Sequence, residues 1–182
     1  MTPDCENLLC YYFILMKNFE NLYEGFKPEL TPKQMLEYGI FGGSYLGDTI
    51  NEYPKSWFKN AKISKAFDVN LNYFKIKAGL SWREWNRKGW IMKEDPKGWF
   101  QWYCRYSVGR RIPAIDKIQI GRWRAFGPRH IGAIKKNCRK KYFSCRRKQR
   151  QALLQWAYNP FFNFFSNILN LLEIFLMQSL LQ

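Results

Sequence analysis

The part of this chain that most restricts its fold runs from residue 101 to residue 150. It contains sixteen Lys and Arg and a single acid, Asp116, so it carries +15 of the chain's net charge of +16. Aromatic and aliphatic residues recur in and just before it at spacings of three and four, which place them on one face of a helix. The pattern predicts a mainly α fold, a compact multi-helix single domain. The recurring residues are Trp99, Trp102, Tyr103 and Tyr106, then Ile115, Ile118, Arg122 (which continues the spacing), Trp123 and Phe126.

Capping residues and prolines mark where helices should begin and end. Thr31 before Pro32 predicts the start of a short helix that ends near Gly39, because proline fits the first helical position. Ser81 and Glu84 have the spacing of a capping box and predict another start.

The same signals divide the basic segment. Asp95 and Pro113 predict two helix starts, Gly127 followed by Pro128 predicts a break, and Ser144 predicts a further start. We therefore expect residues 101–150 to form about four short helices. The aromatic stripe that includes Trp102 is expected to face the core.

The length of 182 residues suits one domain with a sizeable core. We expect a basic, aromatic-rich helical domain over residues 28–160. A hydrophobic N-terminal helix over 1–27 precedes it, and an amphipathic C-terminal helix over 161–182 follows. The apolar run at 8–16 is too short to span a bilayer, so both end helices are expected to pack on the domain or on a partner, with membrane association as the alternative.

Five cysteines make an odd number in a chain large enough to fold without disulfides. With no convincing secretory leader, this favours free thiols in a reducing intracellular compartment, nuclear if the source is eukaryotic, and argues against secretion. His130, Cys138 and Cys145 lie within sixteen residues but lack the close pairing of zinc ligands. We predict no metal and no small-molecule cofactor, with a zinc site as the weaker alternative.

Four glycines between residues 39 and 47 predict a loop with unusual backbone angles. The spacing matches neither a P-loop nor a dinucleotide fingerprint. A tight turn packed under aromatic residues is the favoured interpretation. The alternative is a pocket or phosphate-facing loop bordered by Tyr38, Gly42, Gly43, Tyr45 and Asp48.

The concentrated charge predicts a polyanionic partner, since the rest of the chain is nearly neutral: +2 over residues 1–100 and −1 over 151–182. Arginine suits phosphate because its planar fork makes bidentate contacts. We predict a face that binds DNA or RNA, with an anionic membrane or acidic protein as the alternative. Trp123, if exposed, is the candidate platform for stacking an unpaired base. The predicted face consists of Arg110, Arg111, Arg122, Arg124, Arg129, Lys140, Lys141, Arg146, Arg147 and Arg150.

Two further function classes stay open. One is an enzyme acting on DNA or RNA, of nuclease or glycosylase type, with a pocket at the glycine-rich loop. Asp48 and Glu52 would then share a helix face, and His130 is the single imidazole in the chain, which makes these three residues weak catalytic candidates. The other is an adaptor that associates with a membrane or a partner through 161–182.

Three segments carry a resemblance: residues 38–43 (YGIFGG), 98–106 (GWFQWYCRY) and 147–158 (RKQRQALLQWAY). On these the chain resembles an uncharacterised family of small, basic, tryptophan-rich proteins, over about residues 31–160. The resemblance implies one compact domain and carries no activity, cofactor or site residue.

Overall fold

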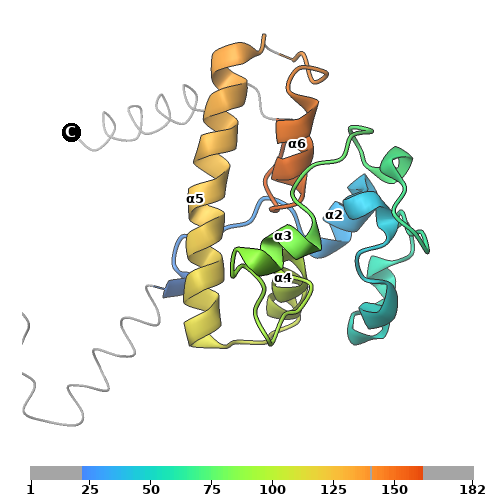
Figure 1. Cartoon of the computed structure of the whole chain (residues 1–182), viewed down its shortest axis with the longest axis vertical. Helices are drawn as coiled ribbons and strands as arrows, with labels where there is room; N and C mark the ends of the chain where they lie inside the picture. Colours follow the sequence, from blue (N-terminus) through green and yellow to red (C-terminus); the bar gives the residue numbers. More distant parts are fainter. Residues whose placement is uncertain (1–21, 140, 162–182) are drawn as a thin grey trace, which may run out of the picture.

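The computed structural model describes residues 22–139 and 141–161. Within these ranges the chain forms helices and turns without a β-strand, so the predicted mainly α class is confirmed (Figure 1). No helix in these ranges has the length and apolarity that a membrane span requires. The predicted end helices over 1–27 and 161–182 lie almost wholly outside the described residues. The helices are α2 (Pro32–Tyr38), α3 (Trp82–Arg87), α4 (Trp99–Ser107), α5 (Pro113–Asn137) and α6 (Arg147–Leu154), with 3-10 turns η1 (Phe41–Gly43), η2 (Gly47–Glu52), η3 (Lys55–Trp57) and η4 (Val69–Leu71).

The longest element, α5, passes without interruption through the predicted break (Figure 1). The prediction failed because Gly127 lets the Tyr158 ring lie directly on the helix: a Cβ at Gly127 would be 2.2 Å from that ring. Tyr158 also stacks on Trp123 and donates its hydroxyl proton to the Trp123 carbonyl oxygen at 2.8 Å. This packing offsets the roughly 3 kcal/mol that Pro128 costs inside a helix. The basic segment is therefore the body of α4, one long helix and the start of α6.

Three of the predicted helix starts are confirmed, since α5 begins at the predicted Pro113, and two are wrong. Thr31 and Ser81 both form complete capping boxes. Asp95 caps no helix because its carboxylate is buried in ion pairs, and α4 begins after Gly98. Arg146, in the left-handed conformation with φ 55°, precedes α6, so Ser144 lies in the loop before it.

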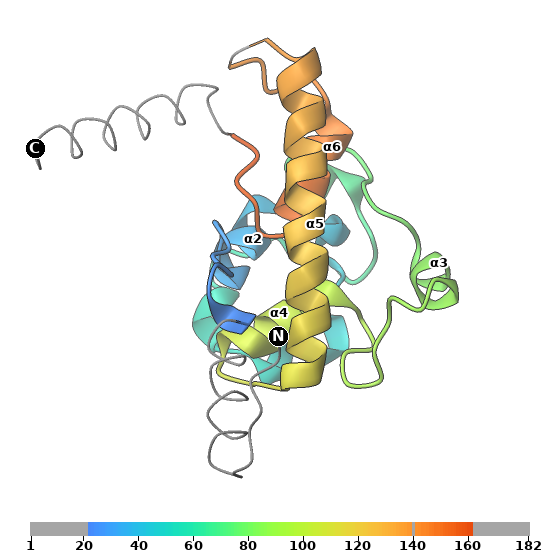
Figure 2. The same cartoon turned by 90° about the vertical axis from the view of Figure 1, so that its left-hand side faces the viewer.

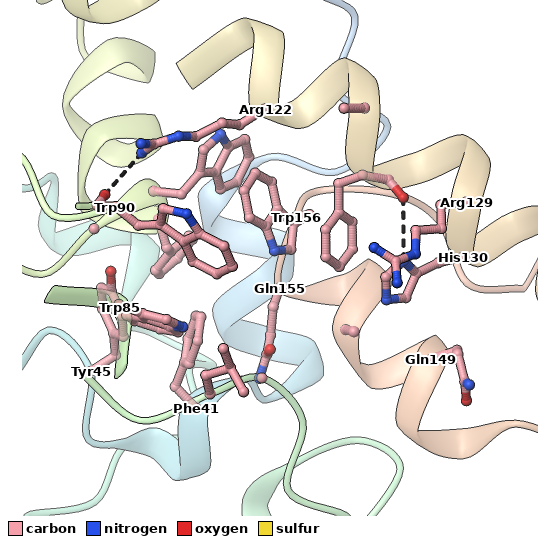
Figure 3. A pocket seen from close by; sticks show the side chains of 18 of the residues that line it. Phe41, Tyr45, Trp85, Trp90, Arg122, Arg129, His130, Gln149, Gln155 and Trp156 are labelled. Atoms are coloured by element: carbon pink, nitrogen blue, oxygen red, sulfur yellow. Dashed lines mark hydrogen bonds between the residues drawn. The ribbon is translucent and has the colours of Figure 1, made fainter. Parts of the chain in front are cut away.

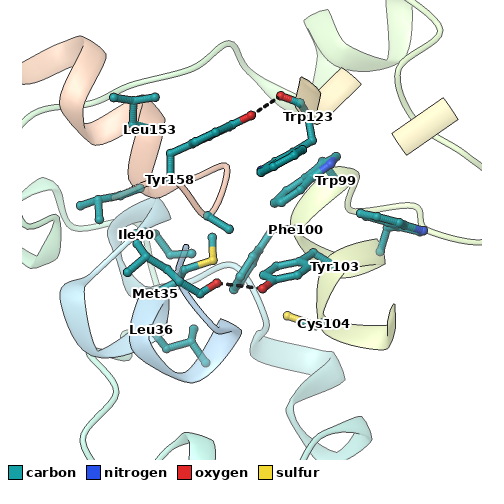
Figure 4. Packing of buried hydrophobic residues seen from close by; sticks show 14 of the residues in the cluster. Met35, Leu36, Ile40, Trp99, Phe100, Tyr103, Cys104, Trp123, Leu153 and Tyr158 are labelled. Carbon is teal, nitrogen blue, oxygen red and sulfur yellow. Dashed lines mark hydrogen bonds between the residues drawn. The ribbon is translucent and has the colours of Figure 1, made fainter. Parts of the chain in front are cut away.

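The core is mainly aromatic and is centred on α4 (Figure 4). Trp102 and Phe100 are almost fully buried, which confirms the core position predicted for Trp102. They belong to one cluster with Met35 from α2 and Leu153 from α6. Burial of such rings is the largest favourable contribution to the stability of a small helical domain.

Asp116, the one acid of the basic segment, is fully buried in this core. Its carboxylate accepts hydrogen bonds from Trp102 Nε1 at 2.8 Å, from the Tyr23 hydroxyl at 2.9 Å and from the Ile112 backbone amide at 3.0 Å. These three donors compensate the desolvation of the carboxylate and join the start of α5 to α4.

The glycine-rich loop is held by buried amide side chains. Asn72 accepts a hydrogen bond from the Gly42 amide at 2.8 Å, and Gln151 of α6 donates to the Gly39 carbonyl oxygen at 3.1 Å. A Cβ at Gly39, where φ is 80°, would lie 1.9 Å from the Leu71 carbonyl oxygen. Close backbone approach therefore requires glycine here, which agrees with the tight-turn interpretation.

Cys138 and Cys145 form a disulfide across the loop between α5 and α6, with their Cα atoms 5.8 Å apart. The expectation of free thiols is wrong for this pair, because the end of α5 and the approach to α6 bring two cysteines seven residues apart into bonding distance. Cys104 is a buried free thiol. The reducing compartment stays a prediction, one with which a disulfide agrees poorly.

Candidate functional site

Five of the arginines predicted to bind nucleic acid contact the protein itself. Arg110 forms an ion pair with buried Asp95, with 2.6 Å between Nη2 and Oδ2. Arg111 lies over the Tyr106 ring, 3.5 Å from its centroid, and donates to the Tyr106 carbonyl oxygen at 2.7 Å. The other three, described next, are Arg122, Arg124 and Arg150.

These three tie loops to helices through backbone carbonyl oxygens. Arg122 donates to Trp90 at 2.9 Å and Arg124 donates to Glu24. Arg150 is almost fully buried and donates to the carbonyl oxygens of Cys145, at 2.9 Å, and of Pro160. Burial lowers the pKa of Arg122 and of Arg150 from the ordinary arginine value.

A second group of bases lies at the C-terminal end of α5 and the start of α6 (Figure 1). We name it the basic end. All eight of its side chains are exposed, and none forms a hydrogen bond or ion pair with another residue of the described chain. Four were predicted and four were missed, while the predicted Lys140 lies outside the described residues. The basic end consists of Arg129, Lys135, Lys136, Arg139, Lys141, Arg146, Arg147 and Lys148.

Trp123 does not meet the condition set for a stacking platform, because its ring is 7% exposed. The Trp123 and Tyr158 rings stack with centroids 4.7 Å apart and planes inclined by 5°. The arginines on either side of Trp123 donate to carbonyl oxygens of loops, although Arg124 is also exposed. Base stacking, if it occurs, needs another aromatic surface.

Such a surface lines a cavity of about 620 Å³ between the α3 segment, α5 and α6 (Figure 3). Figure 2 shows the segment that carries α3 extending to one side of α5. The cavity walls are mostly aromatic, and no Asp or Glu lines it. Trp90, at 42% exposed, reaches both the cavity and solvent. The aromatic residues that line the cavity are Phe41, Tyr45, Trp85, Trp90, Trp99, Phe100, Phe126 and Trp156.

One wall of the cavity is a continuous stack of rings. Trp99 stacks on Trp156 with centroids 4.8 Å apart, Trp156 on Phe126 at 4.6 Å, and Phe126 on His130 at 4.0 Å. Three elements supply these rings: α4, α5 and the turn after α6. Because each ring is fixed by its neighbours, the wall is pre-organised.

Cations stand where the cavity meets the basic end. Arg129 and Lys148 line the cavity and also belong to the basic end, and Gln149 lies beside them. His130 contacts the Phe126 carbonyl oxygen through Nδ1 at 3.3 Å. Burial, and to a lesser degree the charge of Arg129, lower the pKa of His130, so the imidazole is neutral at neutral pH. Because Arg129 and Lys148 are positively charged and no carboxylate lines the cavity, its polar part is suited to an anion.

The weak catalytic candidates Asp48 and Glu52 are each paired with a basic side chain. Asp48 pairs with Lys97, which lowers the pKa of the Asp48 carboxyl, and Glu52 accepts two hydrogen bonds from Arg105, at 2.8 and 2.9 Å. They lie on the 3-10 turn η2 rather than on an α-helix, and neither lines the cavity, whereas His130 does.

Of the four predicted loop residues, Tyr45 lines the cavity. Its hydroxyl donates to the Lys97 carbonyl oxygen. Tyr38 instead packs against Tyr73. Gly42 and Gly43 pack against neighbouring backbone and side chains in the interior of the loop. Among the described residues, no three His, Cys, Asp or Glu side chains are grouped as metal ligands would be.

The sequence analysis missed Trp85, Trp90 and Lys148. The only sequence signal for the two tryptophans is an aromatic-rich segment, residues 82–90, which begins at the Ser81 capping box, whereas Lys148 belongs to the basic segment. Searches of protein-family models, of curated proteins and of solved structures find no match to this chain. Function is therefore inferred from the charge and geometry of the molecule alone.

Proposed function

We propose that this protein binds nucleic acid through the basic end. Between residues 129 and 148 the sequence has nine Lys and Arg and no acid. The eight that the structure describes are exposed and unpaired within the described chain. This unpaired charge is the observation that carries the proposal, because a cluster of like charges repels itself unless an anion neutralises it.

Local helix electrostatics account for only a few of these bases. Lys135 and Lys136 lie in the last turn of α5, where positive charge is favourable, with Arg139 just beyond. Arg147 and Lys148 occupy the first turn of α6, where positive charge is unfavourable. A bound phosphate offsets that cost, so the second pair supports a polyanion more strongly than the first.

The backbone of the loop adds a second reason. Lys141 and Arg146 both have positive φ, 57° and 55°, which a residue with a side chain adopts at a cost of about 1 kcal/mol or more. The disulfide between Cys138 and Cys145 closes a loop that contains Lys141 and ends one residue before Arg146. Restraint of the backbone beside these bases reduces the entropy lost on binding a phosphate backbone.

A charge-reversal variant of the basic end, compared with a matched control variant, tests the proposal. Arg139→Glu, Arg146→Glu and Arg147→Glu together remove three exposed bases of the basic end. We expect at least about a tenfold loss of affinity for single-stranded DNA or RNA, and a slope of log affinity against log salt that is shallower by about two. Fluorescence anisotropy between about 50 and 200 mM salt measures both quantities.

The matched control carries the same charge change on another part of the surface. Lys55→Glu, Lys59→Glu and Lys65→Glu replace three exposed lysines that lie outside the basic segment. Equal loss in both variants would mean that net charge alone attracts nucleic acid. Absence of salt-dependent binding by the unmodified protein would overturn the proposal itself.

A further inference from the structure

We propose that the aromatic cavity holds the base of an unpaired nucleotide, with the adjoining phosphate on Arg129 and Lys148. This inference rests on the proposed function and specifies which form of nucleic acid the basic end receives. Arg129 and Lys148, two of the three cations that line the cavity, are also members of the basic end. A strand neutralised by the basic end therefore passes the opening of the cavity.

The lining of the cavity favours an aromatic ligand. The stacked wall formed by Trp99, Trp156 and Phe126 lines it, and so do Trp85 and Trp90 of the α3 segment (Figure 3). The volume of about 620 Å³ lies within the range of small-molecule sites, about 300–1,000 Å³, and is larger than a single base requires. Stacking on aromatic rings accepts any base, because every base has a π face.

The polar groups distinguish a nucleotide from a neutral aromatic ligand. No carboxylate lines the cavity, so an anion meets no like charge there. The Gln149 side chain forms no hydrogen bond within the described chain and lines the cavity, where its amide can pair with a base edge. Nucleic-acid bases, unlike aliphatic or neutral aromatic ligands, combine a flat ring, amide-like edges and an attached phosphate.

Arg122 explains how the site keeps its shape without a ligand. Its guanidinium donates to the carbonyl oxygens of Trp90, at 2.9 Å, and of Gly89, at 3.3 Å. The loop that carries Trp90 is thereby fixed to α5. Arg122 acts as a positioning residue that holds the exposed indole at the cavity mouth, rather than as a phosphate ligand.

Two variants and one optical probe test this inference. A single-stranded oligonucleotide with one 2-aminopurine reports stacking, because its fluorescence is quenched when the base packs on an aromatic ring. With the unmodified protein we expect quenching and binding of the single strand at least about tenfold tighter than of a blunt duplex. Trp90→Ala should lose most of the quenching and roughly tenfold in affinity.

Trp82→Ala is the matched control, since Trp82 lies in the same segment, is 54% exposed and does not line the cavity. It should bind and quench like the unmodified protein. Quenching in the unmodified protein stays informative if Trp90→Ala fails to fold. Salt-dependent binding without quenching, and without a single-strand preference, would overturn the cavity inference and leave the basic end intact. No binding of any oligonucleotide would overturn the proposed function as well.

A titration with a free mononucleotide shows whether the cavity binds a nucleotide from solution or a base within a strand. A strand engages both the cavity and the basic end, so an adenosine monophosphate titration should show affinity at least about 100-fold weaker than the oligonucleotide. Equal affinities would assign the cavity to free nucleotides and contradict its role in strand binding.

Discussion

Within one run of sequence, the arginines at 110–124 and the bases at 129–148 contact different partners. Arg122 and Arg124 donate to backbone carbonyl oxygens of loops, Arg111 donates to the Tyr106 carbonyl oxygen near the end of α4, and Arg110 pairs with a buried carboxylate. The basic end forms no such contact within the described chain. A guanidinium has five donors, so it can satisfy carbonyl oxygens that loops leave without a helix or sheet partner. A count of positive charge thus overestimates the surface available to a polyanion.

The position of the change along α5 follows from packing. Before Gly127 the helix lies on the aromatic core through residues such as Ile120 and Trp123. Beyond it, α5 still buries Ile134 but exposes Lys135 and Lys136. Arginines near the core have loops within reach, whereas the basic end has mainly solvent. We infer that the first group serves stability and the second serves binding.

The largest effect is expected at Asp95, which is fully buried between Arg105 and Arg110. Asp95→Asn leaves the Arg110 guanidinium without its counter-charge and leaves Arg105 with Glu52 alone, so the free energy of unfolding should fall by about 3 kcal/mol. Urea denaturation followed by circular dichroism measures it. Asp48→Asn, in a largely exposed ion pair, is the control and should leave the denaturation midpoint unchanged. A stable Asp95→Asn protein would contradict a structural role for Arg110.

The next effect is expected at Gly127, where the Tyr158 ring packs on α5. Gly127→Ala should destabilise the fold by about 2 kcal/mol, since the new methyl group overlaps the Tyr158 ring and outweighs the helix propensity of alanine. Gly132→Ala, on the same helix with open space around it, should instead stabilise by about 0.5–1 kcal/mol. Thermal melting compares the two, and equal shifts would mean that Tyr158 does not fix α5.

Single arginine variants sharpen the comparison directly. Arg111→Ala should lower the free energy of unfolding by about 1 kcal/mol, through the lost ring contact and carbonyl hydrogen bond, and leave nucleic-acid affinity within about twofold. Arg147→Ala should change stability by less than about 0.5 kcal/mol and reduce the salt slope by about 0.7–0.9. The reverse pattern in anisotropy and denaturation would exchange the two roles.

Sequence reasoning recovered what short-range signals determine. The capping boxes at Thr31 and Ser81 involve residues three positions apart, so their pattern suffices to identify them. The continuity of α5 was not recoverable, because the stabilising ring belongs to Tyr158, about thirty residues beyond Gly127. Because α5 continues through Gly127 and Pro128, two residues that ordinarily end a helix lie inside one here.

The candidate site was recoverable only as a total charge. Arginines were assigned to binding by type, yet the partners of Arg122 and Arg124 are backbone carbonyl oxygens, which every residue has and no pattern marks. Trp123 was chosen because arginines flank it, but flanking arginines on a helix point to other faces. Trp90 has no flanking arginine. It is held at the cavity by a hydrogen bond from Arg122 to its carbonyl oxygen, and the two residues are 32 positions apart in the sequence.

The smallest expected effect concerns His130, which lies where the two groups of bases meet. Its pKa is lowered by burial, so the unfolded chain binds the proton more readily than the folded one. Stability should therefore be fully present above the ordinary histidine pKa of about 6.5 and be lost gradually as pH falls through the lower folded pKa. His130→Gln should flatten this part of the stability profile.

Ligand binding should act on the same group in the opposite direction. Arg122, Arg129 and Lys148 are the cations that share the cavity with His130, and none of its lining residues is acidic. A phosphate on Arg129 and Lys148 adds negative charge near the ring and should raise the pKa of His130. Because the chain has a single histidine, one proton resonance reports the change in a pH titration by NMR. A His130 pKa that is the same with and without bound oligonucleotide would mean that the phosphate does not lie near Arg129. The binding residues of α5 would then begin further along the helix than Arg129.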